Sequence, residues 1–175
     1  MANREALREL QSRLARRLQQ ARSEQRTSSW LAVECAGLGL LLPLPSAGEI
    51  FPVGALLPVP HTRPWFLGVT NLRGGMHGVV DLAAFLGLRA PTPLDGVREG
   101  AQLLAFNAAQ GAHCAVLIDR LAGLRSAAQL SPEPAEAAAR PDFAAARWRD
   151  EAGRVWQEID LAALAHNDQF LAIAA

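Results

Sequence analysis

The run from Gly68 to Leu88, GVTNLRGGMHGVVDLAAFLGL, constrains the fold of this chain more than any other segment. Its first part interleaves apolar and polar residues, which is typical of a strand. Gly74 and Gly75 then allow the backbone to reverse, and a second extended segment and a short helical pattern follow. The run therefore predicts a β-hairpin with Asn71 and Arg73 near its tip, where such polar side chains face solvent.

Short strands separated by turn signals make up most of the chain after residue 29. The turn signals recur about every ten residues, a spacing typical of all-β barrels and sandwiches rather than of βαβ units. Residues 64–67 are predicted to form one helical turn that begins with proline, residues 126–141 a long surface loop, and residues 161–168 a short helix. Besides the hairpin, the predicted strands are residues 30–36, 40–45, 47–53, 101–107, 112–119, 121–125, 142–150 and 154–160.

Residues 3–26 carry the clearest helical pattern, a leucine stripe at helical spacing. Residues 1–28 hold seven Arg against three Glu, so the predicted amphipathic helix is basic. Two interpretations stay open: the helix packs on its own domain with a solvated arginine face, or it docks on a partner helix. Nucleic-acid binding is disfavoured, because the segment has no aromatic residue for base stacking and the whole chain has no basic excess.

The charge and composition of the whole chain exclude several classes of function. The 17 basic residues balance the 17 acidic residues, so no overall field favours nucleic acid or an anionic membrane. All 17 basic residues are Arg, which excludes chemistry based on a lysine amine. No apolar stretch approaches the ~20 residues of a membrane helix, and the N-terminus lacks a signal-peptide pattern. We therefore expect a cytoplasmic protein without direct membrane insertion.

A search for catalytic and metal-binding patterns gives no convincing constellation. No two histidines stand at i,i+4, and none lies near cysteines at zinc spacing. Asp81 and Asp119 could form a carboxylate pair, but each directly follows an apolar strand, where Asp usually caps a turn or a helix. Cys35 and Cys114 lie in apolar runs and are expected to be free, buried thiols. We therefore predict no catalytic residue, no metal site and no cofactor.

The hairpin run resembles the signature of the CheW family, the adaptor domains of bacterial chemosensory arrays. Three further segments resemble family elements in the same order: Glu49-Ile50, residues 116–124 (VLIDRLAGL) and residues 156–164 (WQEIDLAAL). The family usually has Pro where this chain has Gly78, which predicts a looser entry to the second strand of the hairpin. The matching hairpin residues are Gly68, Val69, Asn71, Leu72, Arg73, Gly74, Asp81 and Leu82.

The resemblance covers residues 30–165 and implies a mainly β, CheW-like fold. It implies two five-stranded SH3-like barrel subdomains with short helices, packed on a shared apolar interface with a groove between them. We therefore expect three parts: an N-terminal amphipathic helix extension over residues 1–28, a CheW-like domain over residues 29–165, and a C-terminal tail over residues 166–175.

The resemblance also implies a non-catalytic scaffold function. Such an adaptor couples a methyl-accepting chemoreceptor to a CheA-type histidine kinase. One surface pairs barrel to barrel with the regulatory domain of the kinase, and a groove accepts the helical hairpin tip of the receptor. It is cytoplasmic and is recruited to membrane-associated receptor arrays. The N-terminal leucine helix and the tail HNDQFLAIAA resemble those of the PilI proteins of type IV pilus systems, which points to twitching motility.

Carried over residue by residue, the resemblance places a protein interface at Arg73, Asn71, Gly68 and Glu49. A guanidinium at a hairpin tip offers five donors in a fixed plane and suits a carboxylate, and arginine is enriched among interface hot spots. Structural roles stay open beside this one. They are turn geometry for Gly68 and Asn71, an internal pair with Asp81 or another acid for Arg73, and a solvated edge charge for Glu49.

Two other classes of function compete with the adaptor. One is a small β-barrel that binds a ligand or single-stranded nucleic acid. The four tryptophans argue against it, because they are dispersed in apolar runs and not laid out for base stacking. The other is an enzyme with an unfamiliar site, which the lack of clustered His, Asp, Ser or Cys disfavours. Salt-insensitive binding to a kinase fragment favours the adaptor, whereas salt-dependent binding to an oligonucleotide favours the nucleic-acid module.

Overall fold

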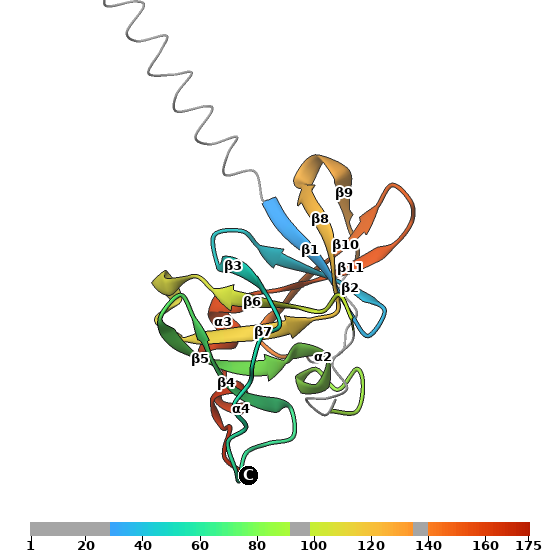
Figure 1. The fold of residues 1–175 in the computed structure, drawn as a ribbon. Helices are drawn as coiled ribbons and strands as arrows, with labels where there is room; N and C mark the ends of the chain where they lie inside the picture. The colour runs from blue at the N-terminus through green and yellow to red at the C-terminus, as the bar shows by residue number, and fades with distance from the viewer. Residues whose placement is uncertain (1–28, 92–98, 135–139) are drawn as a thin grey trace, which may run out of the picture.

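The strands of this chain form two curled sheets (Figure 1). The computed structural model describes residues 29–91, 99–134 and 140–175, and the helix predicted over residues 3–26 lies outside them. The first sheet has six strands, in the spatial order β8 (Arg120–Ser126), β1 (Ser29–Cys35), β2 (Leu38–Pro43), β11 (Val155–Ile159), β10 (Ala144–Asp150) and β9 (Leu130–Pro132). The second has five, in the order β3 (Ala47–Pro52), β6 (Gln102–Phe106), β7 (Cys114–Ile118), β5 (Gly75–Asp81) and β4 (Phe66–Leu72).

The short α-helices each begin at an Asp or Asn side chain that caps them. Asp81 Oδ1 accepts a hydrogen bond from the backbone N–H of Ala84 at 3.2 Å, and Asp160 and Asn167 cap the two C-terminal helices in the same way. The capping role expected of Asp81 is therefore confirmed. The helices are α2 (Leu82–Phe85), α3 (Leu161–Ala165) and α4 (Asp168–Leu171), with 3₁₀ turns η2 (Ala108–Gln110) and η3 (Ala127–Gln129).

The first two and the last four strands of the described chain form the six-stranded sheet, and the five strands between them form the five-stranded sheet. β1 and β2 form a hairpin, and β2 pairs in parallel with β11 on its other side. This pairing depends on Gly39, because a Cβ at that position would lie 2.6 Å from the Trp156 ring. The parallel pair therefore joins strands from the two ends of the fold into one sheet.

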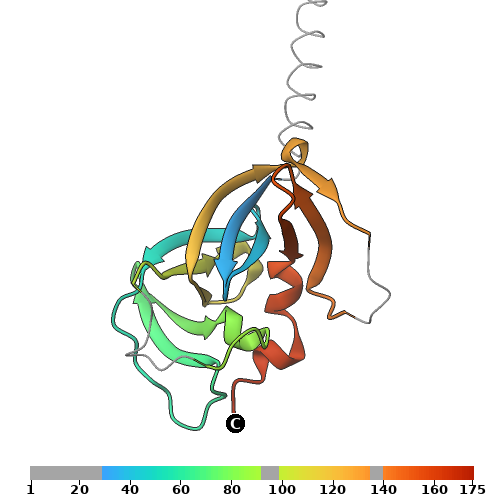
Figure 2. The ribbon, with the colours of Figure 1, turned by 90° about the vertical axis from the view of Figure 1, so that its right-hand side faces the viewer.

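One shared apolar core joins the two sheets, with the C-terminal helices beside their junction (Figure 2). The core combines Val33 and Leu42 of the six-stranded sheet with Leu104 and Val116 of the five-stranded sheet, and with Phe170 of α4. Each sheet also encloses a smaller apolar cluster of its own. Burying one large apolar side chain contributes about 1.5–3 kcal/mol, so the shared core holds the two barrels together as one unit.

The mainly β fold with two barrel-like sheets is confirmed, and the structure differs from the expectations, or adds to them, in three places. The first sheet has six strands instead of five, because β9 forms inside the predicted loop of residues 126–141 and pairs with β10. The helical turn predicted at residues 64–67 is only a turn, since Phe66 already pairs with Val80 as part of β4. The C-terminal tail contains α4, because Phe170 reaches the shared core.

Candidate protein-interaction site

The tip of the β4–β5 hairpin is a two-residue turn. The chain reverses at Arg73 and Gly74, which have φ values of 49° and 84°, while Leu72 pairs with Gly75 across the hairpin. Two central residues with positive φ are typical of the tightest hairpin turns. The prediction that Gly74 and Gly75 make the turn is therefore wrong by one residue. Arg73 itself adopts a left-handed conformation that is uncommon outside glycine.

Asn71 holds this turn from within the hairpin. Its side-chain oxygen Oδ1 accepts a hydrogen bond from the backbone N–H of Gly74 at 2.8 Å, a local contact that favours Asn in turns. The turn-geometry role that the sequence left open for Asn71 is therefore present. The residue is also exposed, so a partner can reach it.

Arg73 forms an ion pair with Glu49 of β3. The two residues come from opposite edges of the five-stranded sheet, so the pair spans the edges where this sheet curls into a barrel. The side chains are 74% and 49% exposed, and ion pairs this exposed contribute at most about 1 kcal/mol. A hollow of about 320 Å³ beside the pair is lined in part by Phe51, Leu72 and His77. The structure thus brings two predicted interface residues together at one concave surface.

Gly68 lies earlier in β4, farther from the hairpin tip, and its backbone packs against Leu57 of the same chain. Its φ is 126°, and a Cβ there would lie 2.2 Å from the carbonyl oxygen of Leu57. Leu57 and Val69 exchange two backbone hydrogen bonds, at 2.8 and 2.9 Å. The close backbone approach that Gly68 allows is therefore made within the molecule, by Leu57. Contact between Gly68 and a partner stays a prediction.

We expect Gly68→Ala to lower the free energy of unfolding by about 2–4 kcal/mol, because the positive φ alone costs about 1–3 kcal/mol and the new Cβ would displace Leu57. Urea unfolding followed by tryptophan fluorescence measures the loss. Gly74→Ala is the matched control, since its φ is also positive but its Cβ would meet open space. Equal losses in the two variants would show that the approach of Leu57 does not matter.

Asp81 and Asp119 do come together, because Arg89 binds both carboxylates. The Arg89 guanidinium donates to Asp81 Oδ1 at 2.9 Å and to Asp119 Oδ1 at 2.6 Å. Asp119 Oδ2 also accepts the N–H of Ala36, in the β1–β2 turn, at 2.7 Å. This ion triad therefore links the two sheets beside α2, and both carboxylates are engaged in structure. Arg89 stands in a polar connector with no pattern to mark it, so only the folded chain shows its role.

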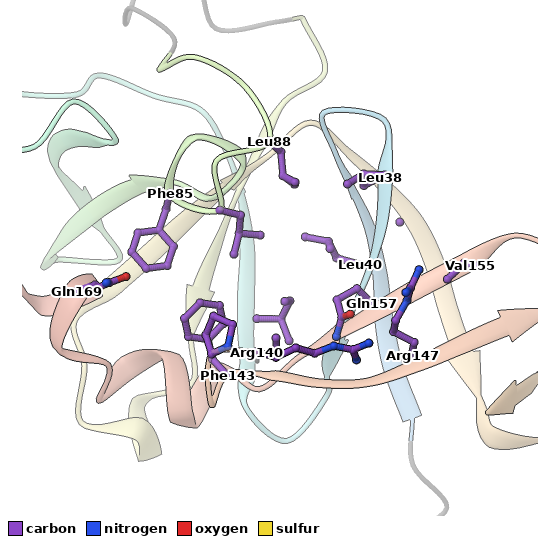
Figure 3. Close-up of a pocket in the computed structure, with 15 residues that line it drawn as sticks. Leu38, Leu40, Phe85, Leu88, Arg140, Phe143, Arg147, Val155, Gln157 and Gln169 are labelled. Atoms are coloured by element: carbon purple, nitrogen blue, oxygen red, sulfur yellow. The ribbon is translucent and has the colours of Figure 1, made fainter. Parts of the chain in front are cut away.

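An apolar groove of about 580 Å³ lies where β2, α2 and the β10–β11 hairpin meet (Figure 3). Leu38 and Leu40 line it from β2, Phe85 and Leu88 from α2 and the residues after it, and Phe143 from the segment before β10. Since α2 directly follows a strand of the five-stranded sheet, the groove lies at the junction of the two barrels. The groove therefore lies where the resemblance implies a groove between the two subdomains.

The sequence model of the CheW-like domain family matches residues 29–169. This chain belongs to the CheW-like domain family. A similar solved structure is the scaffolding protein TtCheW from Thermoanaerobacter tengcongensis, at 15% sequence identity and a TM-score of 0.63. The alignment covers 77% of this chain and 89% of that protein. A comparison with curated proteins gives no match.

This CheW-like chain departs from the family pattern at Gly78. The backbone N–H of Gly78 donates to the carbonyl oxygen of His113 at 3.0 Å, which continues the parallel pairing of β5 with β7. A proline has no N–H and cannot make this bond. A Cβ at Gly78 would also lie 3.1 Å from the Phe66 ring. The expected looser entry to β5 is therefore wrong, because the glycine is fully engaged in the sheet.

Cys35 and Cys114 are free, as expected, although Cys114 is only half-buried. Burial raises the pKa of each thiol to about 12, so both stay protonated and unreactive at neutral pH. Within residues 29–91, 99–134 and 140–175, no group of three or more His, Cys, Asp and Glu residues could hold a metal ion. In the same ranges, no helix is both long enough and apolar enough to span a bilayer.

Proposed function

We propose that this chain is a non-catalytic adaptor that couples a methyl-accepting chemoreceptor to a CheA-type histidine kinase. The observation that carries the proposal is the match of the CheW-like domain family over residues 29–169. The shared fold with a protein described as a scaffold agrees with it. A non-catalytic role is also supported by the engagement of Asp81 and Asp119 with Arg89 and by the protonated state of the two thiols.

We assign the hairpin-tip surface of Arg73, Asn71 and Glu49 to the regulatory domain of the kinase. The exposed Arg73–Glu49 pair adds little to stability, while the left-handed backbone of Arg73 carries strain of about 1–3 kcal/mol. Strain of this kind at an exposed, charged turn supports a role in recognition. Gly68 contributes by fixing β4 against residues 56–58.

We assign the apolar groove at the barrel junction to the helical hairpin tip of the receptor. An amphipathic helix can place its apolar face in a groove of this kind. Leu38, at the rim, is 52% exposed, so apolar surface continues beyond the hollow, which supports a macromolecular partner. Each contact can be weak, because an array gains avidity from many linked sites.

We further propose that the adaptor serves a type IV pilus system in the manner of PilI and is recruited from the cytoplasm to membrane-associated receptor arrays. The support is the sequence of the two ends, residues 3–26 and the tail HNDQFLAIAA. A barrel that binds single-stranded nucleic acid has less support, because the tryptophans are engaged internally. Trp30 packs on Trp148 at 5.0 Å between ring centroids, and Trp65 packs on Phe85 at 5.2 Å.

The test is binding of the full chain to the purified regulatory domain of a chemosensory kinase from the same genome, by calorimetry. We expect saturable binding that Arg73→Ala weakens about 30-fold, the loss of one hot-spot arginine worth about 2 kcal/mol. The exchange of charges in Arg73→Glu with Glu49→Arg should restore the internal pair but not the binding.

The matched control is Arg149→Ala, which removes another exposed arginine, paired with Glu133 on the six-stranded sheet. It should bind like the wild type. Absence of binding by the folded wild type would contradict the kinase part of the proposal. Full recovery in the exchanged pair would show that Arg73 acts only through Glu49.

A further inference from the structure

The groove at the barrel junction is apolar but carries positive charge. Arg140 and Arg147 line it together with the apolar side chains of β2 and α2 (Figure 3). Among the described residues that line it, none is Asp or Glu. A guanidinium nitrogen that is desolvated in an apolar hollow is costly unless it has a hydrogen-bond or ion-pair partner.

Arg140 is the residue that lacks such a partner. It is half-buried, and its terminal nitrogen Nη2 is buried with no hydrogen-bond partner among the described residues. By contrast, the guanidinium of Arg89 is bound to the carboxylates of Asp81 and Asp119. A buried guanidinium nitrogen left unsatisfied is destabilising, and a carboxylate is the acceptor that matches its geometry best.

We propose that the groove binds an amphipathic helix of a partner protein that carries one Asp or Glu among its apolar residues, and that this carboxylate pairs with Arg140. This inference rests on the proposed function, in which the receptor tip supplies the helix. It adds the chemical feature that distinguishes a matching helix from other apolar helices. The apolar residues of the helix supply contact area, and the acid fixes its register in the groove.

Charge argues against an occupant from this chain. Residues 1–28 are also predicted to form an amphipathic helix, but they hold seven Arg against three Glu. Placing that basic segment beside Arg140 would bring like charges together in a site with little water, which is unfavourable. A partner helix with an acid has the complementary charge instead.

The test uses two probes on the full chain. The first is a phage library of 20-residue amphipathic helices in which the positions flanking the apolar stripe are randomised. We expect the wild type to enrich Asp or Glu at one fixed position, Arg140→Gln to lose this preference, and Arg140→Glu to enrich Arg or Lys there. The matched control Arg149→Gln should keep the acidic preference.

The second probe is the purified hairpin-tip fragment of a methyl-accepting receptor from the same genome. We expect Arg140→Gln to weaken its binding about tenfold or more, as for the loss of one charged hydrogen bond. If the fragment binds the wild type and Arg140→Gln equally, the role of Arg140 is overturned while the adaptor function stands. If the fragment does not bind but the library still enriches acids, the groove chemistry stands and the receptor assignment fails.

Three further outcomes would overturn the inference. A library without acidic preference would show that Arg140 does not select its partner. Self-association of the wild type that Arg140→Glu abolishes would assign the groove to a second copy. Stronger binding of the fragment after Leu14→Ser and Leu18→Ser would assign the groove to residues 1–28. Unfolding midpoints of all variants within a few degrees of the wild type are the check on folding.

Discussion

Replacing Arg89 with Met should lower the free energy of unfolding by about 3–5 kcal/mol, the usual effect of removing one partner from a buried ion pair. The reason is that Asp81 is fully buried and Asp119 is only 13% exposed, and the substitution leaves both charges without their shared cation. Urea unfolding followed by tryptophan fluorescence measures the change. The triad links the β1–β2 turn to α2 and to the end of β7, so the loss should appear as one cooperative shift of the whole transition.

Two controls make this result specific to the triad. Arg149→Met removes an arginine whose ion pair with Glu133 is partly exposed, at 46% and 24% of the two side chains, and it should change stability by less than about 1 kcal/mol. The triple variant Arg89→Met, Asp81→Asn, Asp119→Asn should recover much of the loss, because Asn can still cap α2 and accept the Ala36 N–H. A stability of Arg89→Met equal to that of wild type would mean that water or another group replaces the arginine.

Phe170→Ala should destabilise the chain by about 3–5 kcal/mol, as for other buried aromatic residues truncated to alanine. Phe170 is 4% exposed and lies in the shared core. Its ring stacks on Phe106 at 5.9 Å and meets Phe85 edge-on at 5.2 Å between centroids. Since Phe85 also lines the groove, the variant should also weaken the proposed binding of the receptor tip. Chemical unfolding and binding of the same preparation measure the two effects.

The neighbouring residue supplies the control for this second prediction. Leu171 is 57% exposed, and Leu171→Ala should stay within about 0.5 kcal/mol of the wild type. Phe170→Leu should lose only part of the stability, because it keeps most of the apolar volume. An unchanged unfolding transition in Phe170→Ala would show that the C-terminal residues do not pack on the core in solution.

Most of the strand pattern could be predicted from the sequence, because hydrophobic periodicity and turn residues act locally. The predictions fail where contacts between residues far apart in the sequence determine the local structure. β9 is only three residues long and forms because it pairs with β10. The position of α4 is fixed by the packing of Phe170 in the shared core, which no local sequence pattern predicts. The turn of the β4–β5 hairpin falls one residue early, since Leu72 and Gly75 pair across it and Arg73 adopts the left-handed conformation.

The same contrast between local patterns and distant contacts applies to the candidate sites. Arg73 and Glu49 could be named from the sequence, but their contact depends on how the five-stranded sheet closes. The roles of Arg89 and Arg140 could not be predicted. Both lie in segments that read as connectors, and their significance comes from buried surroundings that form only when the two barrels meet. Local patterns predict surfaces better than they predict buried polar groups, because burial is a property of the whole fold.

The parallel pairing of β2 with β11 has a consequence for synthesis on the ribosome. Glu34 and Arg154 form an ion pair next to the paired strands β2 and β11, and they are 120 residues apart in the chain. The ribosome adds about 5–20 residues per second, so β11 emerges on the order of 6–24 s after the β1–β2 hairpin with which it pairs. During that interval one edge of β2 is open, and such edges are prone to pair with other chains. The five-stranded barrel, complete by residue 118, can fold first and shield the shared apolar face of the hairpin until translation ends.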